Sequence, residues 1–257
     1  MQGRLPEICE RRRYNGIGEG DRQGQKDFIM PLIDKYKTLL FDLDGTLTDP
    51  KTGITRSVRY ALLKMGIADV DVESLVKFIG PPLKDSYKKY YGFTEEEADL
   101  GIAYYREYFA GTGIFENTMY PGIGDLLGAL RGEEIRLFVA TTKPTVYAEK
   151  ICDYFDISRY FEEIMGSELD GRLSDKGELI RFIIEKHDIG SSEALMLGDR
   201  EHDIFGAKRN FIESVGVGYG YGTRAELEAA GATYYAGSIG ELSELLLGNQ
   251  VERTQRL

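Results

Sequence analysis

Two carboxylates stand two residues apart where an apolar run ends. Asp42 and Asp44 follow the run at positions 38–40 and precede Gly45 and Thr46. At the end of a strand, both side chains can point the same way, while the glycine permits a tight turn and leaves backbone N–H groups open to an anion. An Asp-x-Asp pair also occurs in ordinary capped turns. The apolar run before this pair and the Gly-Thr after it favour a functional role.

A second acidic pair, Asp199 and Asp203, also follows an apolar run. Alone, it is equally typical of an acidic start to a helix, which the helix dipole favours. If these carboxylates meet Asp42 and Asp44 at one sheet edge, they repel one another unless a cation lies among them. Hard oxygen ligands in small number, with room for water and a phosphate, suit Mg²⁺. The four aspartates therefore predict a magnesium site.

Two further segments could contact a phosphate. Thr141 and Thr142 close another apolar run, where a hydroxyl can donate to a phosphate oxygen, although threonine is also common at strand ends. Lys176 falls at the predicted start of a helix. An isolated lysine is most often a surface residue. At a helix N-terminus, however, a cation is electrostatically unfavourable unless it serves an anion, which favours a role for Lys176.

Short apolar runs alternate with helical patterns from Lys37 onward. This alternation predicts an α/β fold: a doubly wound, Rossmann-like parallel sheet with helices on both faces and right-handed crossovers. The predicted strands are residues 38–43, 135–141, 194–197, 214–217 and 233–235. The predicted helices are residues 122–130, 145–155, 176–186, 202–208, 224–230 and 239–247. Capping boxes are predicted at Thr223 with Glu226 and at Ser238 with Glu241.

One region, from about 53 to 118, shows helical patterns and no convincing strand. Thr94 with Glu97 predicts a capping box that opens a long helix, and Gly80-Pro81-Pro82 separates two others. An insertion after the first strand would lie over that strand's C-terminal end, where open parallel sheets bind ligands. Its six tyrosines between positions 87 and 108 are more typical of the insertion's own core than of a nucleobase pocket.

These patterns divide the chain into four parts. Residues 1–34 are predicted to be a disordered extension, because residues 1–29 carry glycines among charged and amide residues without an apolar period. Residues 35–53 and 119–248 are predicted to form the catalytic core, residues 54–118 a helical cap, and residues 249–257 a flexible tail.

Composition excludes several classes of protein. The net charge of −11 over 257 residues argues against a nucleic-acid or anionic-membrane binder, since both need a basic face. Only two cysteines occur, Cys9 and Cys152, so a disulfide framework is not expected. No apolar run reaches the roughly 18 residues that a membrane span needs. We therefore expect a cytoplasmic protein that binds neither nucleic acid nor membrane.

The order of these motifs resembles the haloacid-dehalogenase superfamily, in the branch of phosphoglycolate phosphatases. The resemblance rests on Phe-Asp-Leu-Asp-Gly-Thr-Leu, on Thr-x-Lys-Pro, on Lys176 and on Gly-Asp-x-x-x-Asp, and it covers about residues 37–247. The helical insertion is similar to that superfamily's small cap. The resemblance implies a Mg²⁺-dependent phosphatase that forms an aspartyl-phosphate. Because dehalogenases lack an acid at the position of Asp44, this residue favours a phosphatase.

The resemblance also implies residue roles. Asp42 would be the nucleophile and Asp44 the general acid and base, while Thr141 binds the phosphoryl group and Lys176 neutralises its charge. The metal would be held by Asp42, Asp199 and the backbone carbonyl of Asp44. Asp203 would either reach the metal through water or pair with Lys176.

Substrate contacts are expected from Gly45, Thr46 and Thr142, with Lys84 and Arg56 facing the site from the cap. The expected partner is a small phosphorylated metabolite, such as phosphoglycolate or a nucleoside monophosphate, bound by a monomer or homodimer. Alternatives are a phosphomutase, a protein-tyrosine phosphatase, a phosphoacceptor module and an inactive binding protein. A receiver-type phosphoacceptor module would be about half this length and would lack the helical insertion.

Overall fold

The structure is a computed structural model that describes residues 30–248. The predicted tail at 249–257, Cys9 and most of the predicted N-terminal extension lie outside the described residues. The extension was predicted to reach residue 34, but residues 32–34 belong to helix α1 (Leu32–Lys35). Leu32 and Ile33 are buried in the main core, and α1 packs against the last helix of the chain, which explains the difference.

Six parallel strands form the central sheet, in the order β5-β4-β1-β6-β7-β8. The strands are β1 (Thr38–Phe41), β4 (Arg136–Pro144), β5 (Glu163–Ser167), β6 (Ala194–Gly198), β7 (Glu213–Val217) and β8 (Tyr234–Ala236). All residues of β1 are buried, as expected for the middle of a sheet that is covered on both faces. Register pairs Phe41, the last residue of β1, with both Val139 of β4 and Leu197 of β6, so β1 ends between these two strands.

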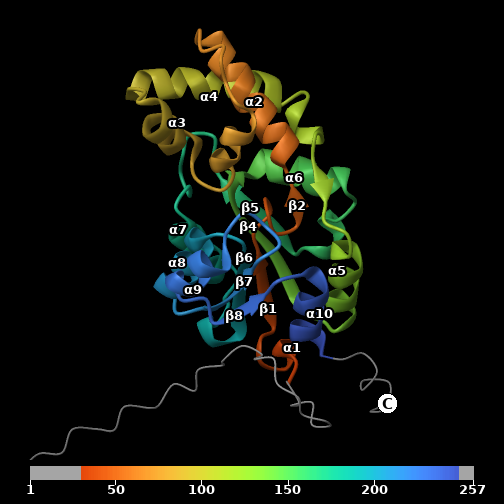
Figure 1. Cartoon of the computed structure of the whole chain (residues 1–257). Coiled ribbons are helices and arrows are strands. Elements are labelled where there is room, and N and C mark those ends of the chain that lie inside the picture. Colours follow the sequence, from red (N-terminus) through yellow and green to blue (C-terminus); the bar gives the residue numbers. More distant parts are fainter. Residues whose placement is uncertain (1–29, 249–257) are drawn as a thin grey trace, which may run out of the picture.

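Helices cover both faces of this sheet, as the alternating pattern predicted (Figure 1). One layer contains α5 (Ile123–Gly132), α6 (Thr145–Tyr154) and α10 (Ile239–Leu247), and the other contains α7 (Lys176–Lys186), α8 (Glu201–Arg209) and α9 (Arg224–Ala230). Side chains alternate along β1, so that Leu39 and Phe41 join one apolar cluster and Leu40 joins the other. The predicted bounds of α7, α9 and α10 agree with the structure.

The edge strand β5 was not predicted. Its sequence Glu-Ile-Met-Gly-Ser has only two large apolar residues, and its first two residues are only partly buried, because an edge strand needs little apolar character. Strand β4 also extends three residues beyond its predicted end at 141. These last residues continue along β5 after a shift in register, and Pro144 pairs with Ser167.

The insertion between β1 and β4 is helical, and Figure 1 shows it above the C-terminal ends of the strands. It contains α2 (Lys51–Lys64), η1 (Glu73–Phe78), α3 (Leu83–Tyr91), α4 (Glu95–Phe109) and η2 (Gly113–Phe115). The chain enters and leaves it through a two-stranded antiparallel ribbon of β2 (Thr48–Asp49) and β3 (Thr118–Met119). Of the six tyrosines that were expected in the core of the cap, Tyr87 and Tyr105 are buried and the other four are partly buried.

Helix caps agree with the sequence in part. Thr94 and Glu97 form the complete capping box that was predicted. Thr223 and Ser238 each accept the predicted N–H, but the glutamates three residues later do not complete the box. Glu226 instead accepts from Arg200, and Glu241 accepts the N–H of Gly237. In both cases another donor has replaced the N-cap N–H as partner of the glutamate.

We predict that Gly53→Ala destabilises the cap. A Cβ at position 53 would lie 1.9 Å from the carbonyl oxygen of Gly113, so helix α2 and η2 would have to separate. We expect a loss of about 1–3 kcal/mol in the free energy of unfolding, typical of overpacking, as measured by urea denaturation. Gly111→Ala is the matched control, because a Cβ there meets nothing within 4 Å. Equal stability of the two variants would contradict the prediction.

Candidate active site

The buried Lys176 contacts three segments that lie far from it in the sequence. The Nζ of Lys176 lies 2.8 Å from Asp42 Oδ1 and 2.7 Å from Asp203 Oδ1, and it donates to the carbonyl of Ala140 at 2.8 Å. Lys176 is the first residue of α7, which begins after Asp175, whose side chain accepts the N–H of Glu178. The lysine side chain is 4% exposed. The ammonium group thus donates to Asp42 and to Ala140 and lies at ion-pair distance from Asp203, so two carboxylates compensate the buried charge.

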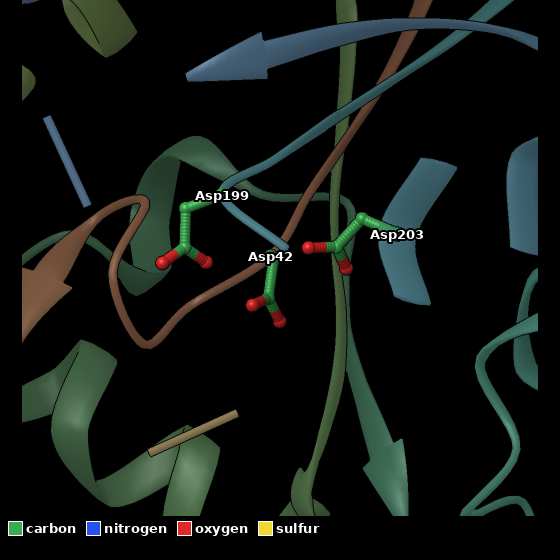
Figure 2. A group of neighbouring side chains, drawn as sticks. All are labelled: Asp42, Asp199 and Asp203. Carbon is green, nitrogen blue, oxygen red and sulfur yellow. The ribbon is translucent and has the colours of Figure 1, made fainter. Parts of the chain in front are cut away.

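Three aspartates gather beside this lysine. One carboxylate oxygen from each of Asp42, Asp199 and Asp203 lies within 4.8 Å of the others, and all three residues are buried. Figure 2 shows the three side chains approaching one another. Asp42 and Asp199 follow the neighbouring strands β1 and β6, and Asp203 comes from the first turn of α8. Oxygen donors at this spacing can hold a metal ion.

Burial and neighbouring charges shift the pKa values of Asp199 and Lys176. Burial first, and then the charges of Asp203 and Asp42, raise the pKa of Asp199 well above its ordinary value. Burial alone would lower the pKa of Lys176, but the two aspartates beside it outweigh burial and raise it. Oδ2 of Asp199 accepts the N–H of Tyr221 at 2.7 Å, whereas its buried Oδ1 has no hydrogen-bond partner. A buried oxygen without a donor is a position that a cation would satisfy.

Asp44 has a lysine of its own. Its Oδ2 lies 2.7 Å from Nζ of Lys143, whose side chain is 6% exposed and whose ammonium lies 4.7 Å from the centre of the Phe109 ring. Burial raises the pKa of Asp44, and Lys143 opposes this shift. The four carboxylates and two ammonium groups would carry a net charge of −2 when ionised. One divalent cation would balance that charge.

The turn after Asp42 differs from the prediction in one respect. The turn was expected to leave backbone N–H groups open to an anion; those of Gly45 and Thr46 are occupied, because Gly45 donates to Thr48 at 2.7 Å and Thr46 to Leu43 at 3.3 Å. The turn consumes these donors because it reverses the chain within a few residues. Gly45 has φ of +84°, and a Cβ there would lie 2.2 Å from Asp199 Oδ2, so glycine is required for close approach.

Thr141 and Thr142 lie at the end of β4 with different surroundings. Thr141 is buried, and its hydroxyl accepts the N–H of Lys143 at 3.3 Å. The hydroxyl of Thr142 instead donates to the carbonyl of Gly80 in the cap, at 3.4 Å. Nearby, Arg200 donates to the carbonyl of Ile79 at 2.9 Å. Core residues next to the site thus hold the backbone of one cap loop.

The structure does not bring Lys84 or Arg56 to the aspartates. Lys84 forms ion pairs with Glu95 and Asp99 within the cap, at 3.0 and 2.8 Å, and the exposed Arg56 pairs with Glu116. A cavity of about 810 Å³ also lies elsewhere, along the edge strand β5 between α6 and α7. The site itself is enclosed: Asp42 is 7% exposed and Asp199 is fully buried.

Sequence reasoning missed Lys143, Arg200 and Tyr221. The signal for Lys143 was its place two residues after Thr141, since alternate residues of a strand face the same side. Tyr221 belongs to the run Gly-Tyr-Gly-Tyr-Gly after β7, whose alternating glycines indicate close backbone packing. Arg200 follows Asp199 directly, but its contact with the cap has no local signature.

Comparison with known proteins gives a consistent family. The sequence model described as haloacid dehalogenase-like hydrolase matches residues 39–217. A solved structure described as a predicted phosphatase from Clostridium acetobutylicum superposes with a TM-score of 0.81 and 49% identity, covering 84% of this chain and all of that one.

Curated relatives carry three different names. The chain is 46% identical to a 5'-nucleotidase of Pseudomonas aeruginosa, over 82% of this chain and 96% of the relative. It is 35% identical to tyrosine-protein kinase PtkA of Mycobacterium tuberculosis, over 81% of this chain and 72% of that protein. It is 26% identical to a phosphoglycolate phosphatase of Vibrio parahaemolyticus, over 82% and 96% respectively.

We predict that Lys176→Met strongly destabilises the protein at neutral pH. The substitution leaves Asp42 and Asp203 buried without their shared cation, and loss of one partner from a buried ion pair costs about 3–5 kcal/mol. Lys186→Met is the control, because its pair with Glu163 is 45% exposed on the lysine side and exposed pairs contribute about 1 kcal/mol or less. Urea denaturation of both variants measures the difference. Losses of similar size would contradict the prediction.

Proposed function

Since the chain belongs to the haloacid dehalogenase-like hydrolase family, we propose that it is a Mg²⁺-dependent phosphatase that hydrolyses small phosphate monoesters with Asp42 as nucleophile. One observation carries the proposal: Asp42, Asp199 and Asp203 converge within 4.8 Å while Lys176 bridges two of them. Relatives named as phosphatases and as a 5'-nucleotidase support the reaction class.

The residues fit a divalent metal ion. Asp42 and Asp199 would be its protein ligands, since the buried Oδ1 of Asp199 lacks any other partner and carboxylate oxygens suit Mg²⁺. Asp203 already contacts Lys176, which favours the second of its two predicted roles, pairing with the lysine. When bound, Mg²⁺ would offset the repulsion between Asp42 and a phosphate dianion.

In the first step, a carboxylate oxygen of Asp42 attacks phosphorus, and the bond from phosphorus to the leaving oxygen breaks. Lys176 holds Oδ1 of Asp42 and so orients the carboxylate, and the Thr141 hydroxyl would donate to a phosphoryl oxygen. Phosphoryl transfer depends mainly on such positioning and on charge stabilisation. The product of this step is an aspartyl-phosphate and a free alcohol.

Asp44 would supply the proton that the leaving alkoxide takes up. In the second step, water attacks phosphorus, gives its proton to Asp44, and the bond between phosphorus and Asp42 breaks. Lys143 holds Oδ2 of Asp44, which leaves the other carboxylate oxygen without a hydrogen-bond partner and free to exchange the proton. Asp44 thus returns to its starting state after each turnover.

A small substrate fits this site best. The cap loop at Ile79 and Gly80 is held against the core by Arg200 and Thr142, and Asp42 is buried, which favours a small substrate. Phosphoglycolate and nucleoside monophosphates are the favoured substrates, and the 5'-nucleotidase at 46% identity supports the nucleotide. We propose a small phosphorylated metabolite as the partner. The part of the chain from 30 to 248 contains no helix long and apolar enough to cross a membrane.

A protein-tyrosine phosphatase activity is the second candidate: a relative at 35% identity is named a tyrosine-protein kinase, a name that supports a tyrosine side chain as substrate group but not its dephosphorylation. Such a substrate would need the cap to open widely, since Asp42 is enclosed.

Retention of the phosphate in a labelled sugar product would instead indicate a phosphomutase.

We predict that Asp42→Asn abolishes turnover while the fold survives, because an amide oxygen cannot replace the carboxylate as nucleophile. The test is phosphate release from para-nitrophenyl phosphate, phosphoglycolate, nucleoside monophosphates and a phosphotyrosine peptide, with circular dichroism as the check on folding. Asp153→Asn, which changes a carboxylate on α6 outside the site, is the control. Activity of Asp42→Asn within tenfold of the wild type would refute the nucleophile assignment.

We also predict that removal of divalent metal silences the enzyme. EDTA should reduce phosphate release to background, and excess Mg²⁺ should restore it, since Asp42 and the phosphate dianion would otherwise repel each other. Ca²⁺ at the same concentration is a useful comparison, because it prefers more ligands and a looser geometry. Full activity in EDTA would rule out the metal role.

A further inference from the structure

The segment between β7 and α9 contains residues that the proposed mechanism does not use. It reads Gly218-Tyr219-Gly220-Tyr221-Gly222 and passes directly beside Asp199. A Cβ on Gly220 would lie 2.4 Å from Asp199 Cβ, and one on Gly222 would lie 1.9 Å from the Asp199 carbonyl oxygen. The backbone of this segment is therefore pressed against the proposed metal ligand, and only glycine permits the approach.

Tyr221 makes two contacts in opposite directions. Its backbone N–H donates to Oδ2 of Asp199 at 2.7 Å, which orients that carboxylate and leaves Oδ1 for a cation. Its side-chain hydroxyl donates to Oδ1 of Asp49. One residue thus contacts the proposed metal site with its backbone and Asp49 with its side chain.

Asp49 lies in the connection between the core and the cap. It is the second residue of β2 and pairs with Thr118 of β3, so both crossings of the chain pass beside it. The same Oδ1 accepts the N–H of Lys51, the first residue of α2. A shift of the cap about this ribbon would move Asp49, and with it the hydroxyl of Tyr221.

We propose that Tyr221 is a positioning residue that couples the cap hinge to the metal ligand Asp199. The inference rests on the proposed function, because it takes Asp199 as a ligand of Mg²⁺. Partners that orient a metal ligand typically change metal affinity by about 10–100-fold when they are removed. Tyr221→Phe keeps the backbone donor and loses only the tether to Asp49, so the change should be smaller.

The test is a titration of the metal-free protein with Mg²⁺ in the absence of substrate. The melting temperature is measured at each Mg²⁺ concentration. A ligand that binds only the folded state stabilises it by RT ln(1 + [L]/Kd), so the dependence of the melting temperature on Mg²⁺ concentration gives the Kd for Mg²⁺. We expect Tyr221→Phe to raise that Kd about three- to tenfold, below the usual range for direct partners of a ligand. Tyr154→Phe is the control, because Tyr154 is 54% exposed on α6. A Tyr221→Phe value within twofold of the control would overturn the proposal.

Variants of Asp49 test whether the effect of Tyr221→Phe on Mg²⁺ binding depends on the contact with Asp49. Asp49→Ala removes the acceptor, so Tyr221→Phe should then have no further effect on the Kd for Mg²⁺. An equal additional loss in the Asp49→Ala background would mean that the hydroxyl acts by another route, and would overturn the coupling. Should Tyr221→Phe fail to fold, Asp49→Ala carries the test alone: weaker Mg²⁺ binding supports the proposal and unchanged binding overturns it.

The wild-type titration distinguishes the two levels of inference. If Mg²⁺ does not stabilise the wild-type protein at all, the proposed metal site is wrong and the coupling falls with it. If the wild type binds Mg²⁺ but Tyr221→Phe binds it equally well, only the coupling is wrong.

Discussion

Burial of the Lys176 ammonium group constrains the rest of the catalytic edge. Removing a lone charge from water is costly, so the ammonium group must meet acceptors and opposite charges, which come from Asp42 after β1, from Ala140 in β4 and from Asp203 in α8. Helix α8 comes close enough only because position 206 is glycine: a Cβ there would lie 2.8 Å from Cγ of Lys176. The positions of Asp42 and Asp203 follow from this one requirement, and Asp199 completes a site whose excess negative charge suits a divalent cation.

The general arrangement of fold and site could be predicted because it depends on local patterns and one rule of topology. Apolar runs marked β1, β4 and β6, and parallel strands bring their C-terminal ends to one edge. Register then places Asp42 beside the strand that carries Asp199, since Phe41 pairs with Leu197. The sequence allows two roles for Asp203, water-mediated contact with the metal or pairing with Lys176, because it does not give the distance between two helices.

What could not be predicted depends on contacts between distant segments. Strand β5 lies at an edge, where burial demands little of the sequence, and its pattern was therefore weak. Lys84 has the charge of a substrate ligand and stands in the first turn of α3, yet α4 offers Glu95 and Asp99 as partners. Lys143 could have been found from strand alternation, but only if β4 had been known to continue past 141.

The pairing of α1 with α10 places both ends of the described chain at the pole opposite the cap (Figure 1). A Cβ on Gly248 would come within 2.9 Å of the Pro31 ring, so the two ends nearly touch. Adjacent ends of this kind suit circular permutation and surface immobilisation. A carrier attached at either end of the described chain would leave the catalytic edge of the sheet facing away from the support, with the cap unobstructed.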